Sequence, residues 1–196
     1  MTGLRELKKQ QTRNRIADVA IRLFAERGFD NVAVAAIARE AEVSEATVFN
    51  YFPSKEDLVY GGMDEFEEAL VEAVRERKEG QSAFGAFREF LLQPRGALTS
   101  GQTDRIATAA RIIAGSPALQ ARELRSFDRH TAALAEVLQR EGQAAPWVVA
   151  NALIGVQRAM KDAVHRHALA GRHGDHITKD VIEQARVALD VLERGL

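Results

Sequence analysis

The stretch VAVAAIAREAEVSEATVFNYF, residues 32–52, decides the fold of this chain. Its apolar residues recur at helical spacing and predict one short helix over residues 34–41 and a second over residues 45–52. Ser44 stands just before the second helix and offers a hydroxyl N-cap. Two short helices joined by a tight turn form a helix-turn-helix, and the second helix of such a pair fits the major groove of DNA. The residues predicted to face inward are Ile37, Ala38, Ala41, Val48 and Phe52.

The outward face of residues 45–52 is predicted to be polar. Thr47, Asn50 and Tyr51 follow i, i+3, i+4 spacing, and Glu45 and Ala46 stand at the helix start. Side chains placed in this way can reach the edges of base pairs. Three ordinary core-forming helices with a charged tail would give a similar pattern, so the motif taken alone leaves that alternative open.

Two further features provide positive charge near the motif. Residues 54–57, Ser-Lys-Glu-Asp, match the capping box that begins another helix, and its free N–H groups together with Lys55 can bind a phosphate. The first fifteen residues hold five basic side chains and one acidic one, whereas residues 16–60 hold four basic and eight acidic. We therefore expect the amino-terminal arm to provide the positive charge that attracts a polyanion.

The longer run LFAERGFDNVAVAAIAREAEVSEATVFNYFPSKEDL, residues 23–58, resembles the N-terminal domain of the TetR (tetracycline-repressor) family of transcriptional regulators. By motif the resemblance covers roughly residues 7–66. It implies a DNA-binding domain over residues 8–66, with the motif at about 34–52, and a ligand-binding and dimerisation domain over residues 67–196. Carried over by position, it implies phosphate contacts from Thr47, Tyr51 and Lys55 and base contacts from Glu45, Ala46 and Asn50. The complete predicted DNA-binding set is Ser44, Glu45, Ala46, Thr47, Phe49, Asn50, Tyr51 and Lys55.

The chain departs from the family pattern at three positions. Glu42 occupies the turn where the family usually has glycine, and a non-glycine residue held at positive φ costs about 1 kcal/mol. Ala33 replaces a threonine that would cap the first helix of the motif and contact phosphate. Phe49 replaces a tyrosine and so lacks one phenolic hydroxyl. These changes affect individual contacts and leave the predicted fold intact.

The whole chain is predicted to be all-α, because no run of residues alternates apolar and polar side chains convincingly. A small N-terminal three-helix helix-turn-helix domain precedes a larger C-terminal helical bundle, with about nine helices in total, and the resemblance implies a homodimer. The predicted helices span residues 5–27, 34–41, 45–52, 55–79, 82–93, 102–114, 117–141, 146–170 and 177–194.

In the family that the chain resembles, the C-terminal bundle binds a small molecule and forms the dimer. Residues 177–194 carry an apolar seam at heptad-like spacing, and by resemblance this helix and residues 146–170 form a four-helix interface with their two-fold mates. The polar stripe of residues 146–170 faces solvent, a partner chain or a wet pocket, and periodicity does not choose between them. The candidate ligand-binding residues are Phe66, Phe87, Phe127, Asn151 and Arg158.

The amino-acid composition and the absence of certain motifs exclude several classes of function. Lys plus Arg number 27 and Asp plus Glu 28, giving a net charge of −1, so any polyanion site must be local. The absence of cysteine excludes disulfides and sulfur-based metal sites. Neither a signal peptide nor a membrane span is evident, which predicts a cytoplasmic protein without a membrane partner. No catalytic motif is present, and the scattered histidines do not have ligand spacing, so we expect no enzyme, catalytic residue, metal or cofactor.

The leading hypothesis is a DNA-binding transcriptional regulator, a repressor that a small-molecule effector releases from a near-palindromic operator. One alternative is a DNA-binding dimer without an effector. Another is a helical small-molecule binding protein or enzyme with a degenerate DNA head. The identity of the effector, the operator sequence and the regulated genes stay open at this point.

Overall fold

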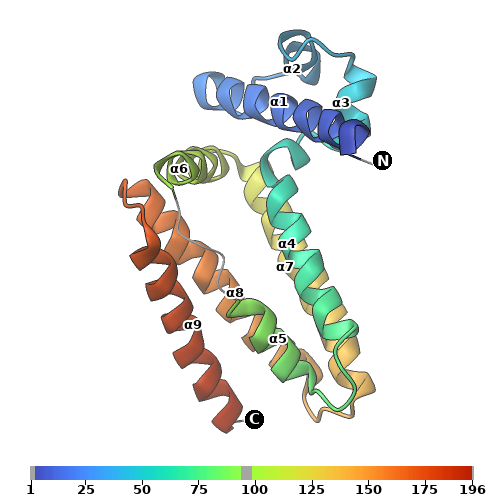
Figure 1. Cartoon of the computed structure of the whole chain (residues 1–196), viewed down its shortest axis with the longest axis vertical. Coiled ribbons are helices and arrows are strands. Elements are labelled where there is room, and N and C mark those ends of the chain that lie inside the picture. The colour runs from blue at the N-terminus through green and yellow to red at the C-terminus, as the bar shows by residue number, and fades with distance from the viewer. Residues whose placement is uncertain (1–2, 94–98, 196) are drawn as a thin grey trace. The chain divides into compact units, whose positions relative to one another are not determined.

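A computed structural model describes residues 3–93 and 99–195 of the chain. Every regular element in these ranges is an α-helix, so the predicted all-α class is confirmed (Figure 1). The helices are α1 (Gly3–Arg27), α2 (Val34–Glu40), α3 (Glu45–Tyr51), α4 (Asp57–Arg75), α5 (Ala83–Leu91), α6 (Ser100–Ala114), α7 (Pro117–Arg140), α8 (Pro146–Leu169) and α9 (Asp175–Gly195).

The largest departure from the predicted boundaries is the end of α4, which stops at Arg75 rather than Glu79. The reason is an arginine cap just beyond the helix. Nη1 of Arg77 donates to the carbonyl oxygen of Val74 at 2.9 Å, and Nε donates to that of Gln81 at 2.9 Å. Helix-end carbonyls need such partners, and satisfying one from outside the helix lets the chain turn early.

The chain divides into two compact units. The first consists of Met1–Met63 and Thr108–Arg122, and the second of Asp64–Ala107 and Glu123–Leu196. Helices α4, α6 and α7 each contribute residues to both units.

The core of the first unit unites the helix-turn-helix with α1. Its members include Ile16 and Phe24 of α1, Ile37 of α2 and Val48 of α3, all of which are almost completely buried. Leu119 of α7 joins the same cluster. Burying these side chains together holds α2 and α3 at a fixed angle on α1, because neither short helix is stable alone in water.

Polar contacts attach the start of α7 to the start of α4 within the first unit. The Tyr60 hydroxyl donates to the carbonyl oxygen of Leu119 at 3.0 Å. Arg122 forms an ion pair with Asp57 and lies over the Tyr60 ring, 4.6 Å from its centroid. These contacts join residues far apart in the sequence.

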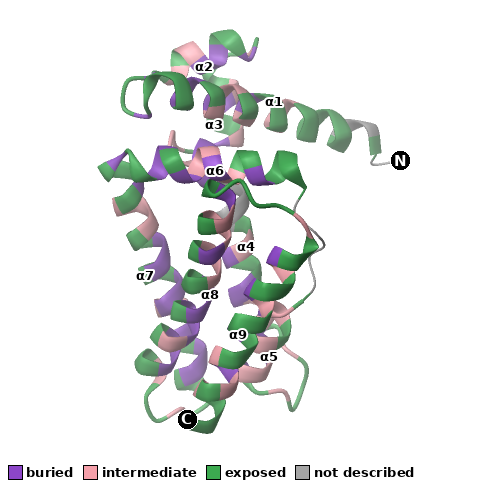
Figure 2. Cartoon of the chain, turned by 90° about the vertical axis from the view of Figure 1, so that its left-hand side faces the viewer, coloured by how far each residue is buried: buried purple, intermediate pink, exposed green. Residues whose placement is uncertain are grey.

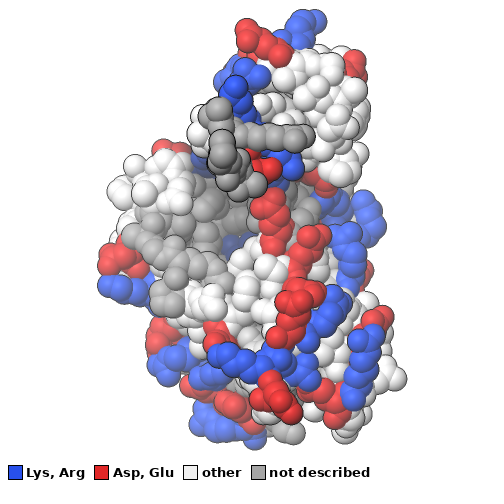
Figure 3. Space-filling model, turned by 45° about the vertical axis from the view of Figure 1, so that its right-hand side comes forward, with Lys and Arg blue, Asp and Glu red and all other residues white. Residues whose placement is uncertain are grey.

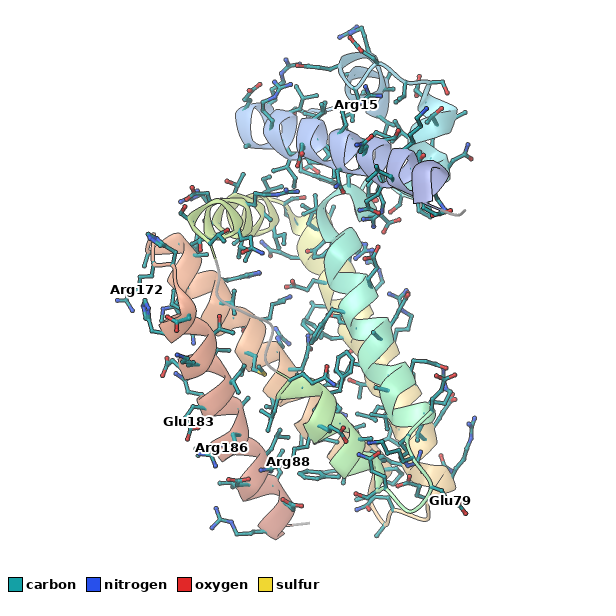
Figure 4. The ribbon with its side chains drawn as sticks, in the orientation of Figure 1. Arg15, Glu79, Arg88, Arg172, Glu183 and Arg186 are labelled. Carbon is teal, nitrogen blue, oxygen red and sulfur yellow. The ribbon has the colours of Figure 1, made fainter. Side chains whose placement is uncertain are left out.

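The second unit is a helical bundle in which α8 and α9 pack closely as antiparallel neighbours (Figure 1). The seam predicted on α9 for a partner chain is largely used within this bundle: Ile177, Val181, Ala185 and Leu189 are buried in the single chain. Arg88 of α5, labelled in Figure 4, also pairs with Asp190 of α9, with Nη2 and Oδ1 2.6 Å apart. Because α8 and α5 cover these four side chains, a dimer through α8 and α9 has to use other residues of the two helices.

Other residues of α9 remain exposed, as Figure 2 shows along its outward side. Val187 and Val191 are each more than half exposed, and so are Trp147 and Val148 at the start of α8. Searched over the described residues, none of the helices is long and apolar enough to span a membrane.

Candidate nucleic-acid interface

The turn between α2 and α3 has the left-handed conformation that the family resemblance implies. Glu42 has a φ of 54°. Of the residues that the structure describes, it is the only one other than glycine with a positive φ. Ser44 caps α3 as expected, its Oγ accepting a hydrogen bond from the Thr47 N–H at 3.0 Å. Ala33, at the N-cap of α2, makes no side-chain cap. The helix-turn-helix thus forms with one good cap and one strained turn residue.

The exposed face of α3 differs in part from the predicted one. Glu45, Ala46, Phe49 and Asn50 are exposed, whereas Thr47 and Tyr51 are only half-exposed. The Thr47 hydroxyl lies 2.8 Å from Ser44 Oγ, and Tyr51 packs against the core of the first unit. The reason is that Thr47 and Tyr51 lie one turn apart, beside the inward-facing Val48. The outermost positions of α3 therefore belong to residues 45, 46, 49 and 50, and we call these four residues the reading face.

The corner after α3 forms the predicted capping box. The Ser54 N–H donates to Asp57 Oδ2 at 2.8 Å, and the Asp57 N–H donates to Ser54 Oγ at 3.3 Å. Nζ of Lys55 donates to the carbonyl oxygen of Phe29 at 2.6 Å and lies 4.3 Å from the centroid of the Phe29 ring. Burial lowers the pKa of Lys55, although the carboxylates of Asp30 and Glu56 oppose this effect. Lys55 thus ties this corner to the turn after α1, and its other N–H groups stay available to a phosphate.

The basic residues of α1 divide into anchored and exposed groups. The Arg13 guanidinium lies 5.1 Å from the centroid of the Phe52 ring. Lys8, Lys9 and Arg15, the last labelled in Figure 4, are exposed. The Arg5 side chain lies outside the described residues. Elsewhere charges of both signs are interspersed over the face in Figure 3, in keeping with the net charge of −1.

The five candidate ligand residues do not form one group in the second unit. Phe127 carries two cations over its ring, with the Arg158 guanidinium 5.1 Å and the Lys161 ammonium 4.7 Å from its centroid. Phe87 is fully buried in the hydrophobic core, and Phe66 is half-buried with its ring centroid 5.5 Å from that of Phe90. Asn151 is exposed, and its amide donates to the carbonyl oxygen of Trp147 at 2.8 Å, on its own helix.

A buried polar cluster in the second unit was missed by sequence reasoning. Glu67 of α4 accepts a hydrogen bond from the Ser126 hydroxyl at 3.0 Å, and Nδ1 of His130 lies 2.9 Å from the same carboxylate oxygen. Burial alone would raise the pKa of Glu67, but His130, Ser126 and the charge of Lys161 outweigh it and keep that pKa below its usual value. Only the i, i+4 spacing of Ser126 and His130 on α7 is visible in the sequence, and it does not point to α4.

Gln157 of α8 is buried, and its Oε1 has no hydrogen-bond partner among the described residues. A buried acceptor of this kind usually has a partner, because an unpaired one carries the full cost of its desolvation. Over the described residues, no group of three or more His, Asp or Glu side chains converges in a way that could hold a metal ion.

Comparison with known proteins bears on the first unit most directly. Residues 16–60 match the family described as "Bacterial regulatory proteins, tetR family". The HTH-type transcriptional regulator TcmR of Streptomyces glaucescens is 32% identical over 146 residues, covering 71% of this chain and 65% of TcmR. The HTH-type transcriptional regulator LuxR of Vibrio harveyi is 48% identical over 58 residues, covering 30% of this chain and 27% of LuxR. The chain therefore spans less than two thirds of the length of either relative.

Solved structures share the fold over nearly the whole chain. The SmeT–triclosan complex has a TM-score of 0.57 at 15% identity, covering 92% of this chain and 89% of that one. Thermus thermophilus FadR, a TetR-family transcriptional repressor in complex with lauroyl-CoA, has a TM-score of 0.53 at 23% identity, covering 94% of both chains.

The fold and the exposed face of α3 define a helix-turn-helix protein of the DNA-binding class. Residues 16–60 match the model of the TetR family, so this part of the chain is a DNA-binding domain of that family.

Proposed function

We propose that this protein is a homodimeric transcriptional repressor that binds operator DNA through α3 and leaves it when a small molecule binds the bundle. The observation that carries the proposal is the exposed reading face, which lies within the matched residues 16–60. We assign DNA binding to residues 8–66, and ligand binding and dimerisation to residues 67–196. The relatives are named as transcriptional regulators, so we propose a binding role rather than an enzymatic one, exercised on DNA in the cytoplasm.

On DNA, two recognition helices related by a two-fold axis would enter successive major grooves about 34–36 Å apart. Thr47 and Tyr51 lie at the edges of the exposed face of α3, and Lys55 lies in the corner that follows this helix. In the proposed complex these positions face the phosphates of the DNA backbone. Their role in this proposal is to position the helix, since contacts to phosphate set the register and contacts to base edges carry the sequence information.

The dimer would form through the sides of α8 and α9 that the single chain leaves exposed. Trp147 is 55% and Val191 58% exposed, with Val148 and Val187 also open. Because the two helices are antiparallel, the start of α8 and the end of α9 lie at the same end of the bundle (Figure 1). Large apolar side chains exposed at one end of a bundle would form an apolar patch, and such patches are typical of a protein interface. A second copy of the chain would cover them.

The effector site is proposed around Phe127, where an aromatic ring and the Arg158 and Lys161 cations lie together in the bundle. SmeT and FadR show that this fold can hold triclosan and lauroyl-CoA respectively. An effector releases DNA only if it binds better to a conformation in which the two recognition helices are misplaced.

Selection of bound sequences from random duplex DNA tests the proposal. A symmetric site should emerge, and its affinity should fall steeply with salt because phosphate contacts release counterions. Failure to enrich any sequence, or binding that is insensitive to salt, would contradict the proposed DNA-binding role. A library of small molecules screened for release of that site then distinguishes the effector-controlled repressor from a DNA-binding dimer without an effector.

A further inference from the structure

We infer that the reading face of α3 recognises thymine methyl groups and adenine edges and carries no guanine-specific contact. This inference rests on the proposed DNA-binding function and adds the base chemistry of the operator.

The order of residues around α3 places two apolar side chains at the centre of the reading face. Successive helical residues are about 100° apart, so the four residues follow one another around the helix as Glu45, Phe49, Ala46 and Asn50 over an arc of about 140°. Phe49 and Ala46 occupy the middle of this arc, and Glu45 and Asn50 flank them. All four are exposed. A base pair that contacts the centre of the reading face therefore contacts the apolar side chains of Phe49 and Ala46.

Packing in the core does not explain why a phenylalanine stands at position 49. It is 45% exposed, although Val48 and Phe52 beside it are buried in the core. Its ring has no hydroxyl, so it cannot bind a phosphate by a hydrogen bond. In the major groove the apolar feature of a base is the 5-methyl group of thymine, which phenylalanine and alanine side chains contact. Ala46, with its single methyl group, lets the helix approach closely enough for this contact.

Of the two flanking residues, Asn50 favours the same base pair. Its amide can bond to N6 and N7 of adenine. The Glu45 carboxylate can accept a hydrogen bond from the exocyclic amino group of adenine or of cytosine, so it discriminates against guanine and thymine on the strand that it contacts. Guanine presents two acceptors, N7 and O6, which call for arginine or lysine. Helix α3, EATVFNY, contains neither. Lys55, the next basic residue along the chain, lies beyond the end of α3, at the corner assigned above to a phosphate.

The test uses the intact protein and the duplex site that it selects from random DNA. Each thymine within a half-site is replaced by deoxyuridine, which removes the 5-methyl group and leaves base pairing unchanged. Burying one such carbon is worth about 0.8 kcal/mol, or about fourfold in affinity. Substitution in both half-sites should weaken binding about fifteenfold at one symmetric position, while deoxyuridine outside the half-sites should have no effect.

The Phe49→Ala variant connects this effect to the proposed ring. It should lose most of the dependence on the methyl group, so that thymine and deoxyuridine sites bind alike. Leu124→Ala, which trims another exposed apolar side chain on α7, should keep the full dependence. Because Phe49 is exposed, its removal should leave the unfolding midpoint unchanged, and this measurement shows that the variant is folded.

The remaining outcomes separate the inference from the function on which it rests. A selected site without an essential A·T pair in its half-sites, or wild-type binding that is indifferent to deoxyuridine, overturns the thymine inference while DNA binding stands. If the wild-type protein enriches no sequence at all, the proposed function itself fails.

Discussion

Replacing Glu42 by glycine should stabilise the DNA-binding unit. Glu42 is exposed and holds φ at 54° in the turn between α2 and α3. A left-handed conformation costs an L-residue with a Cβ atom about 1–2 kcal/mol. Glycine removes that cost but gains entropy in the unfolded chain, which offsets roughly 0.5–1 kcal/mol. We therefore expect Glu42→Gly to raise the free energy of unfolding of this unit by about 0.5–1 kcal/mol.

Native-state amide hydrogen exchange over residues 34–52 measures the effect where it arises. An increase of 0.5–1 kcal/mol should slow exchange through unfolding about two- to fivefold. Trp147 is the chain's one tryptophan and belongs to the second unit, so its fluorescence during urea unfolding follows the other unit separately.

The matched control is Glu42→Ala, which removes the carboxylate and keeps the Cβ atom. It should give no comparable protection. If alanine protects as well as glycine, charge rather than backbone strain governs the position. Faster exchange in Glu42→Gly would mean that the entropy of the unfolded chain outweighs the strain, and the reasoning would be refuted.

Three other predictions concern the reading face, the dimer and the buried carboxylate. Asn50→Ala should relax base preference at one operator position, at a cost of about 1–3 kcal/mol there, as binding-site selection with the variant will show. Val191→Glu should give a folded monomer by sedimentation with much weaker operator binding, whereas Leu189→Glu, at a side chain with no exposed surface, should unfold the bundle by circular dichroism. Because the pKa of Glu67 is lower in the folded state, its contribution to stability is present above the ordinary carboxyl pKa and is lost as pH falls through the lowered value. Urea unfolding at several pH values should show this loss in the wild type and not in Glu67→Gln, which should itself cost about 1–3 kcal/mol at neutral pH by weakening the contact with His130.

The sequence by itself determined the features that depend on near neighbours. Ser44 caps α3, and Ser54 and Asp57 form their reciprocal pair, both as predicted. These interactions span at most three residues, so their energies are set before the chain folds. Helical periodicity is similarly local, which is why each helix lies within a few residues of its predicted range.

Only the tertiary structure decided which apolar side chains of a helix pack against neighbouring helices and which stay exposed. Leu189 and Val191 are both apolar residues of α9, yet α8 and α5 bury the first and leave the second exposed. The choice depends on the shape and position of neighbouring helices, which periodicity does not encode. The same reason applies to Glu67 and Ser126, which lie 59 residues apart in sequence and meet only because α4 and α7 pack together. Local chemistry thus determined where the helices begin and turn, and long-range packing decided which side chains became core, site or surface.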